Sequence, residues 1–222
     1  MEQNTTVTNE VLELYGYLED TVRAYNPTAD FVRLRAAFDF AASHHASQRR
    51  RDGSPYVTHP LETAGIVADM GLDDDSLIAA LLHDCIEDTP ATQEELTRLF
   101  GADVADIVDG VTKLTRVHYT SKEEEQMENL RKMLMAMARD IRVILIKIAD
   151  RLHNMRTMEY QKPETQLKKS METMEVYAPI AHRLGMQRVK WELEDLSLRY
   201  IEPTAYESIR AGLEAREREN NN

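Results

Sequence analysis

Apolar residues recur every three or four positions along most of the chain, and this is the period of an amphipathic helix. The clearest case predicts a helix over residues 31–47. Its apolar positions are Phe31, Leu34, Phe38 and Ala41. Residues 49–55 contain turn formers without an apolar period and predict a loop. His59-Pro60 then predicts the start of the next helix, because proline suits the first helical position, and places His59 at or near the N-cap.

Capping residues mark where other helices begin and end. Residues 73–75, all aspartate, favour a helix N-terminus by charge and by capping, and they precede an apolar run over residues 77–82. Thr92 with Glu95 forms a capping box, and Gly101 is a typical C-terminal stop. We therefore expect one helix after the aspartates and another between Thr92 and Gly101.

Further segments complete the secondary-structure prediction. Residues 123–139 are rich in strong helix formers, and Thr204 with Glu207 forms a late capping box. Residues 142–148 are apolar enough for either a buried strand or a buried helix. Because no other segment offers a comparable strand to pair with them, we choose a helix. The predicted fold class is therefore all-α.

The composition is that of a soluble globular protein, with 42% hydrophobic and 30% charged residues among 222. A single cysteine, Cys85, excludes an internal disulfide framework and suits a reducing compartment. The N-terminal residues lack the basic and apolar regions of a secretory signal, and apolar stretches such as residues 143–146 are too short to span a bilayer. We expect a cytoplasmic protein without a membrane partner.

The net charge of −12, from 27 basic and 39 acidic residues, argues against DNA or RNA as a partner. Residues 1–30 alone hold six acids against one arginine, in a part of the chain without candidate chemistry. Local basic residues and a metal can invert the field of one cleft. The overall charge is therefore compatible with a small anionic ligand.

The strongest candidate chemistry is a cluster of polar residues in an apolar helix. His83-Asp84 lies between apolar neighbours, where two polar side chains are costly unless they are paired or bind a metal. Glu87 and Asp88 follow one turn later and can crowd the same side of the helix. An aspartate that hydrogen-bonds a core histidine would explain His83-Asp84 alone, but four such groups within six residues repel one another without a cation.

Other residues could complete a metal site, because His59 lies near a helix start and Asp150 follows the most apolar segment of the chain. Two histidines and two aspartates form a mixed nitrogen and oxygen set, which suits a divalent transition metal without fixing which one. Asp150, Asn154 and Thr157 recur at steps of four and three and share a helix face. We interpret His153 as an ordinary surface or core histidine. The other histidines interpreted as structural are His44, His45, His118 and His182.

The loop before His59 is strongly basic over residues 49–51, which are all arginine. Such a charge run is usually a solvated surface. In a loop that leads directly to a candidate metal ligand, arginines can instead hold phosphate through bidentate contacts.

An ordered series of motifs resembles the HD hydrolase domain of the Rel/SpoT family of (p)ppGpp synthetase-hydrolases. The matching segments are residues 59–60, 83–88, 108–114 and 147–157. Residues 177–185 and 191–196 resemble the segment that joins this domain to the synthetase domain. The match runs from about Phe31 to Tyr206, and long blocks in this order are far more specific than a lone His-Asp doublet.

The resemblance implies an HD-domain phosphohydrolase fold with a C-terminal helical extension. Its expected parts are an acidic helical segment (1–30), the hydrolase core (31–160) and C-terminal helices of the family's linker (161–222). It also implies a manganese-dependent 3′-pyrophosphohydrolase that converts (p)ppGpp, the alarmone of the stringent response, to GDP or GTP plus pyrophosphate. Because nothing after Tyr206 resembles a synthetase domain, we expect an isolated hydrolase region.

Carried over by position, the resemblance assigns roles to individual residues. The manganese ligands would be His59, His83, Asp84 and Asp150. The residues that position or deprotonate the attacking water would be Glu87 and Asp88. The nucleotide would be contacted by Arg50 and Arg51, and its pocket lined by Asn154 and Thr157.

The chain departs from the family in the basic loop. Where the family often has Arg-Lys-Ser-Gly-Glu-Pro, residues 50–55 are Arg-Arg-Asp-Gly-Ser-Pro, so Asp52 adds a negative charge beside the expected phosphate site. Two other functions stay open, namely a catalytically silent module that binds alarmone and an HD phosphohydrolase of another nucleotide. Glu87 and Asp88, whose loss marks hydrolase-dead family members, favour the enzyme. Whether the chain forms homo-oligomers also stays open.

Overall fold

The computed structural model describes residues 7–115, 127, 128, 131, 135 and 138–220. Every regular element in these residues is a helix, and one isolated antiparallel bridge joins Arg49 to Pro55. The all-α prediction is therefore confirmed. The predicted helix over residues 123–139 falls mostly outside the described residues.

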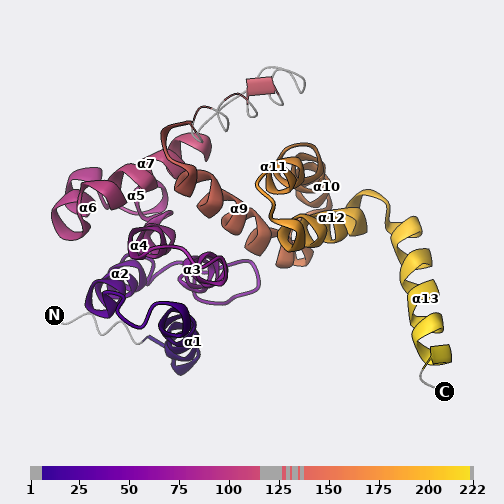
Figure 1. The fold of residues 1–222 in the computed structure, drawn as a ribbon, viewed down its shortest axis with the longest axis horizontal. Helices are drawn as coiled ribbons and strands as arrows, with labels where there is room; N and C mark the ends of the chain where they lie inside the picture. The colour runs from indigo at the N-terminus through magenta and orange to yellow at the C-terminus, as the bar shows by residue number, and fades with distance from the viewer. Residues whose placement is uncertain (1–6, 116–126, 129–130, 132–134, 136–137, 221–222) are drawn as a thin grey trace. The chain divides into compact units, whose positions relative to one another are not determined.

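The chain forms two compact units that divide between His153 and Asn154, in the last turn of α9. The first unit contains, in chain order (Figure 1), α1 (Asn9–Tyr25), α2 (Phe31–His44), α3 (Thr58–Asp69), α4 (Asp74–Leu82), α5 (Cys85–Asp88), α6 (Gln93–Phe100), α7 (Ala102–Thr115) and most of α9 (Ile141–Arg156). The second contains the end of α9, the 3₁₀ helix η1 (Met158–Tyr160), α10 (Pro163–Glu172), the π-helix η2 (Thr173–Tyr177), α11 (Ala178–Arg183), α12 (Gln187–Ile201) and α13 (Pro203–Asn220). The domain boundaries expected after residues 30 and 160 stay a prediction.

The central helix of the first unit is α4, whose side chains from Ser76 to Leu82 are all buried. It packs against α2, α3 and α7, and a helix that is apolar on all sides is typical of such a core position. Asp73 caps its N-terminus by accepting a hydrogen bond from the N–H of Ser76 at 3.2 Å, as the sequence predicts. The helix therefore holds the residue that follows it, His83, inside the unit.

Most of the other predicted helix ends are also confirmed. α2 begins at Phe31, where the predicted helix begins, but it ends at His44 and not at residue 47, because residues 45–47 form a turn. Thr92 caps α6 by accepting a hydrogen bond from the N–H of Glu95 at 3.2 Å. Gly101 ends α6 with a φ of +98°, a conformation that glycine adopts without steric cost. Local capping chemistry thus determines these boundaries.

Two predicted helix starts are displaced. α3 begins at Thr58, so Pro60 is its third residue and not its first. Proline is tolerated there because the N–H groups of the first turn have no acceptor within the helix. The capping box predicted at Thr204 is wrong, because α13 already begins at Pro203. Proline at a first helical position has the φ angle that the helix requires.

Gly110 marks a close approach between α7 and α9. A Cβ atom at Gly110 would lie 2.8 Å from Cγ2 of Val143, whereas a Cβ atom at Gly65 in α3 would meet nothing within 4 Å. Valine is stiff at χ1, so we expect Gly110→Ala to overpack the contact, which typically costs ~1–3 kcal/mol. Gly65→Ala should instead raise the free energy of unfolding by ~1 kcal/mol, the difference in helix propensity.

Thermal unfolding of the two variants beside the wild type tests this pair of expectations. For a chain of this size, 1 kcal/mol corresponds to about 2–4 °C in Tm. We expect Tm to fall for Gly110→Ala and to rise for Gly65→Ala. A rise in both variants would show that Val143 yields to the added methyl group without loss of packing.

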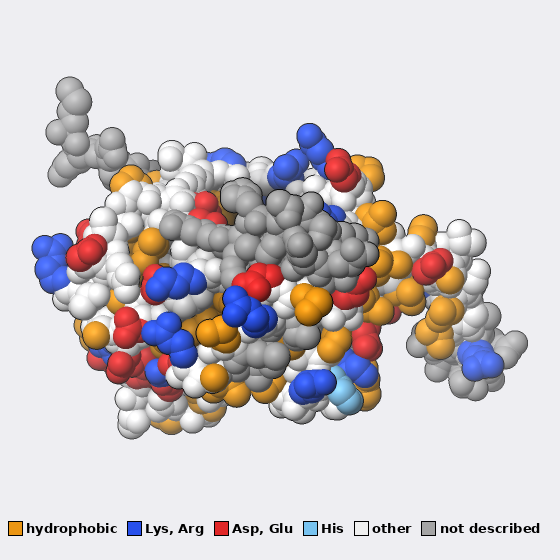
Figure 2. All heavy atoms as spheres, turned by 90° about the horizontal axis from the view of Figure 1, so that it is seen from above, with side chains coloured by type: hydrophobic (Ala, Val, Ile, Leu, Met, Phe, Trp, Pro, Cys, Tyr) orange, Lys and Arg blue, Asp and Glu red, His pale blue; other side chains and the backbone are white. Residues whose placement is uncertain are grey.

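The surface of the described residues carries charges of both signs. On the face drawn in Figure 2, acidic and basic side chains lie interspersed among hydrophobic ones. In the described part of the chain, no helix is both long enough and apolar enough to cross a membrane.

Candidate metal centre

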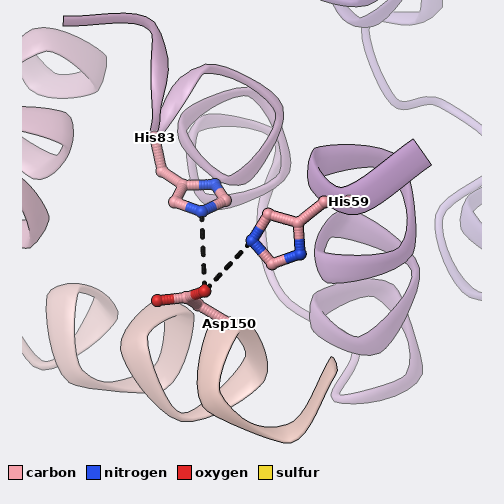
Figure 3. A group of neighbouring side chains, drawn as sticks. All are labelled: His59, His83 and Asp150. Atoms are coloured by element: carbon pink, nitrogen blue, oxygen red, sulfur yellow. Dashed lines mark hydrogen bonds and ion pairs between the residues drawn. The ribbon is translucent and has the colours of Figure 1, made fainter. Parts of the chain in front are cut away.

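Two histidines and an aspartate converge in the first unit (Figure 3). His59 comes from the first turn of α3, His83 follows the last residue of α4, and Asp150 comes from α9. One ligand atom from each lies within 4.8 Å of the other two, and all three side chains are buried. The fold thus brings together residues that are up to 91 positions apart in the sequence.

His83 presents an imidazole nitrogen to this cluster without a hydrogen-bond partner. Its Nδ1 lies 2.6 Å from the carbonyl oxygen of Ala80, and because a carbonyl can only accept, Nδ1 carries the proton. In a neutral imidazole Nε2 then has a lone pair. Within the described residues this buried Nε2 has no hydrogen-bond partner, although Oδ1 of Asp84 is 3.2 Å away and Oδ1 of Asp150 is 3.9 Å away. A lone pair that faces carboxylate oxygens is repelled unless a cation lies between them.

His59 also directs one nitrogen into the cluster. Its Nε2 lies 3.1 Å from Oδ1 of Asp150 and 3.6 Å from Oδ2 of Asp84. Its Nδ1 lies 2.6 Å from Nδ1 of His153, whose side chain is buried. An outer partner of this kind fixes the orientation of a metal-binding imidazole. The interpretation of His153 as an ordinary surface or core histidine missed this contact.

Asp150 keeps its charge in this buried setting because a lysine pairs with it. Lys147, one turn earlier on α9, donates from Nζ to Oδ2 of Asp150 at 2.7 Å, which leaves Oδ1 facing the two histidines. Burial by itself raises the pKa of a carboxyl group, but Lys147 and the neighbouring histidines hold the pKa of Asp150 well below its ordinary value. Asp150 therefore offers a charged oxygen to the centre.

Asp84 joins the cluster from a break between two helices. The sequence predicts His83-Asp84 inside one helix, and this prediction is wrong, because α4 ends at Leu82 and α5 begins at Cys85. Consecutive residues of one α-helix point about 100° apart. His83 and Asp84 keep right-handed helical φ and ψ angles, and both side chains nevertheless contact the same cluster, because Oδ1 of Asp84 lies 3.2 Å from Nε2 of His83 and Oδ2 of Asp84 lies 3.6 Å from Nε2 of His59.

The donor set fits a divalent transition metal. Imidazole nitrogens and carboxylate oxygens together suit such ions, and a bound cation would satisfy Nε2 of His83. Cys85 does not offer a thiolate ligand. Burial and the carboxylates of Asp84 and Asp88 raise the pKa of its thiol, which therefore keeps its proton.

The two carboxylates predicted to act on water lie on the short helix α5. Glu87 and Asp88 are both exposed, in contrast to the buried cluster. Oδ2 of Asp88 accepts a hydrogen bond from the hydroxyl of Tyr56 at 3.0 Å, and the same hydroxyl lies 2.9 Å from Oδ2 of Asp84. Burial and these two carboxylates raise the pKa of Tyr56, so the hydroxyl keeps its proton. One phenol therefore connects Asp88 to a candidate metal ligand.

The basic loop between α2 and α3 turns back on itself. The N–H of Arg50 donates to the carbonyl oxygen of Ser54 at 2.9 Å, and Arg51 is exposed. Asp52 accepts hydrogen bonds from the hydroxyl of Ser54 at 2.6 Å and from its N–H at 2.9 Å, and these bonds lower the pKa of Asp52. The carboxylate that departs from the family pattern is thus engaged within the turn.

The predicted substrate residues Asn154 and Thr157 belong to the second unit. Asn154 lies in the last turn of α9, and Thr157 immediately precedes η1, with its hydroxyl 3.4 Å from the carbonyl oxygen of Asn154. Their part in binding a nucleotide stays a prediction.

The histidines interpreted as structural have varied surroundings. His44 stacks on the ring of Phe40, and His182 is exposed on the second unit. His45 is buried at the end of α2, where burial lowers its pKa. His118 lies outside the described residues.

Two residues that contact the cluster were not singled out in the sequence. Lys147 precedes Asp150 by three positions, a spacing at which helical side chains meet, so this pair could have been found. Tyr56 reaches Asp84 across 28 positions, and no local signal indicates that contact.

An all-α unit that gathers histidines and aspartates from separate helices defines a candidate helical metal-binding domain. The family model described as HD domain matches residues 37–187. The chain therefore belongs to the HD domain family, whose members are metal-dependent hydrolases, and it contains a candidate metal site of that kind. The resemblance to the HD domain of the Rel/SpoT family, predicted from the motifs, is confirmed by similar proteins.

Two curated relatives and one solved structure measure this similarity. The chain is 50% identical over 202 residues to a protein named GTP pyrophosphokinase from Myxococcus xanthus, covering 90% of this chain and 27% of that protein. It is 47% identical over 202 residues to the bifunctional (p)ppGpp synthase/hydrolase SpoT of Escherichia coli strain K12, covering 91% of this chain and 29% of that protein.

The solved structure is described as a metazoan ortholog of SpoT that hydrolyzes ppGpp and plays a role in starvation responses. It matches with a TM-score of 0.54 and 28% identity, covering 75% of this chain and 94% of that chain. The chain spans 27% and 29% of the length of the two curated relatives.

Proposed function

We propose that this chain is a manganese-dependent 3′-pyrophosphohydrolase of (p)ppGpp that yields GDP or GTP plus pyrophosphate. The observation that supports it most is the buried Nε2 of His83, which faces two carboxylates and has no hydrogen-bond partner within the described residues. The names of the Escherichia coli relative and of the metazoan ortholog, both linked to (p)ppGpp hydrolysis, support the substrate. The reaction would serve alarmone turnover in the stringent response.

The proposed ligands of manganese are His59, His83, Asp84 and Asp150. When bound, the ion would lower the pKa of water and offset phosphoryl charge. The chain's own task is to keep the carboxylate ligands charged and to orient both the carboxylates and the imidazoles. Lys147 does this for Asp150 through its 2.7 Å contact with Oδ2.

Glu87 and Asp88 are proposed to accept the proton of the attacking water. Water adds to the phosphorus that is bonded to the ribose 3′-oxygen. The bond between this phosphorus and the 3′-oxygen breaks, pyrophosphate leaves, and the 3′-oxygen takes up a proton. Both carboxylates are exposed, so they can exchange protons with solvent.

Arg50 and Arg51 are proposed to bind the phosphates, with Asn154 and Thr157 lining the nucleotide pocket. A guanidinium group binds phosphate through two parallel hydrogen bonds. The hydrogen bonds that Asp52 accepts support this assignment, because they engage its carboxylate within the turn.

The purified chain is expected to convert ppGpp and water to GDP and pyrophosphate in the presence of Mn²⁺, and a chelator is expected to stop the reaction. Ion-exchange separation of labelled products measures both effects. Binding of ppGpp without product, with manganese confirmed on the protein, would contradict the proposal and favour the silent alarmone-binding module. Release of phosphate or pyrophosphate from another nucleotide, with ppGpp unchanged, would favour the alternative substrate.

A further inference from the structure

The hydroxyl of Tyr56 lies between two carboxylates with different proposed roles. Its oxygen is 2.9 Å from Oδ2 of Asp84, a proposed metal ligand, and 3.0 Å from Oδ2 of Asp88, a proposed proton acceptor. A phenol has one proton to donate, so the two carboxylates share it. Because both carboxylates contact the same hydroxyl oxygen, that oxygen sets the distance between Asp84 and Asp88.

The ring of Tyr56 is held in place by its neighbours. It packs on the ring of His45, with centroids 4.7 Å apart, and meets the ring of His59 edge-on at 6.2 Å. Its backbone N–H donates to the carbonyl oxygen of Gln48 at 3.1 Å. The tertiary structure therefore determines where the hydroxyl lies.

The short helix α5, which carries Asp88, depends on hydrogen bonds from outside the helix. α5 (Cys85–Asp88) is a single turn, and one turn of helix is unfavourable in isolation, because nucleation orders several dihedral angles for one hydrogen bond. Gln48 donates from Nε2 to the carbonyl oxygen of Asp88 at 2.7 Å, and Oε1 of Gln48 lies 2.7 Å from Nδ1 of His45. The end of α2 and the loop after it thus support both the backbone and the side chain of Asp88.

We propose that Tyr56 is a positioning residue for the hydrolytic step: its shared hydroxyl holds the carboxylate of Asp88 at a set distance from Asp84. The hydroxyl donates to Oδ2 of Asp84, the oxygen that also lies 3.6 Å from Nε2 of His59, while Oδ1 of Asp84 lies 3.2 Å from Nε2 of His83. Tyr56 acts through these carboxylates and does not itself accept the proton of water. This inference rests on the proposed function and adds a residue that the family motifs did not single out.

Tyr56→Phe removes the hydroxyl and keeps the ring. With ppGpp and saturating Mn²⁺ we expect kcat to fall about 10–100-fold, the usual effect of losing an outer partner of a metal site, with KM unchanged. The matched control is Tyr25→Phe, which also removes a phenol hydroxyl and with it the hydrogen bond to the carbonyl oxygen of Leu72; neither residue belongs to the proposed site. We expect the control to keep wild-type kcat. A kcat within twofold of wild type for Tyr56→Phe would overturn the proposal.

A double-mutant cycle distinguishes positioning from a general loss of stability. If Tyr56 acts through Asp88, adding Tyr56→Phe to Asp88→Ala should lower kcat no further than Asp88→Ala alone. Independent effects that multiply would overturn the proposal, because they would place the action of Tyr56 elsewhere.

Manganese affinity separates this inference from the proposed function. Titration of Mn²⁺ followed by electron paramagnetic resonance should show about tenfold weaker binding for Tyr56→Phe, because Asp84 loses its outer partner. If the wild-type protein binds Mn²⁺ but leaves ppGpp intact, the proposed function fails, and the Mn²⁺ titration alone tests whether Tyr56 is a positioning residue. Tenfold weaker binding would then support positioning by Tyr56, and unchanged binding would overturn it.

Discussion

His83→Ala is expected to abolish metal retention and turnover together. His83 supplies one of the two buried imidazole nitrogens of the centre, and its loss leaves Asp84 and Asp150 with an incomplete ligand set. Loss of an outer partner typically lowers metal affinity or activity ~10–100-fold, so loss of a ligand should lower it further. Elemental analysis of manganese and ppGpp hydrolysis, measured on the same preparation, test this.

Thermal unfolding gives a second measure of metal binding that does not depend on turnover. Manganese at 100 times its Kd should stabilise the folded wild type by ~2.7 kcal/mol, or about 5–10 °C in Tm. We expect the same shift in His182→Ala, because His182 is exposed on the second unit, and no shift in His83→Ala. Stoichiometric manganese in an active His83→Ala protein would contradict the ligand assignment.

Asp88→Ala and Glu87→Ala are expected to keep the metal and the fold but to lower kcat by ~10²–10⁴-fold, the usual contribution of general-base assistance. Both side chains are exposed on α5, so their removal leaves no cavity in the core. Steady-state rates at saturating Mn²⁺ measure the loss, and manganese content shows whether the metal is retained.

The matched control for these two variants is Glu94→Ala, which removes an exposed carboxylate from the first turn of the neighbouring helix α6. We expect wild-type kcat for this control. If Asp88→Ala and Glu87→Ala also kept wild-type kcat, their carboxylates would be solvated side chains without a part in the reaction, and the silent alarmone-binding module would be favoured.

Most helices could be predicted from the sequence because their signals are local. The helical period of the segment after Phe31, the cap at Asp73 and the stop at Gly101 each depend on residues within a turn or two. Residues 142–148 are an exception, because their local pattern fits a strand as well as a helix; the absence of a comparable partner strand elsewhere in the sequence predicted the helix, and they lie in α9. At Pro203 and Thr204 two start signals compete, and α13 begins two residues before the start that a cap at Thr204 predicts.

The identity of the candidate ligands also came from the sequence, through residue types and the order of the motifs. Their convergence did not, because no local pattern determines that Asp150 of α9 lies 3.1 Å from His59 of α3. That distance results from the tertiary packing of helices whose residues are 91 positions apart in the sequence.

Three details of the centre were decided by the tertiary structure alone. α4 ends before His83 and α5 begins after Asp84, and these two consecutive residues face one cluster. His153 lies against Nδ1 of His59, and Tyr56 lies against Asp84. The sequence by itself determined the helices and the types of ligand, because periodicity and capping act over a few residues. The contacts that orient those ligands join residues 28 and 94 positions apart, and only the packing of the helices brings such residues together.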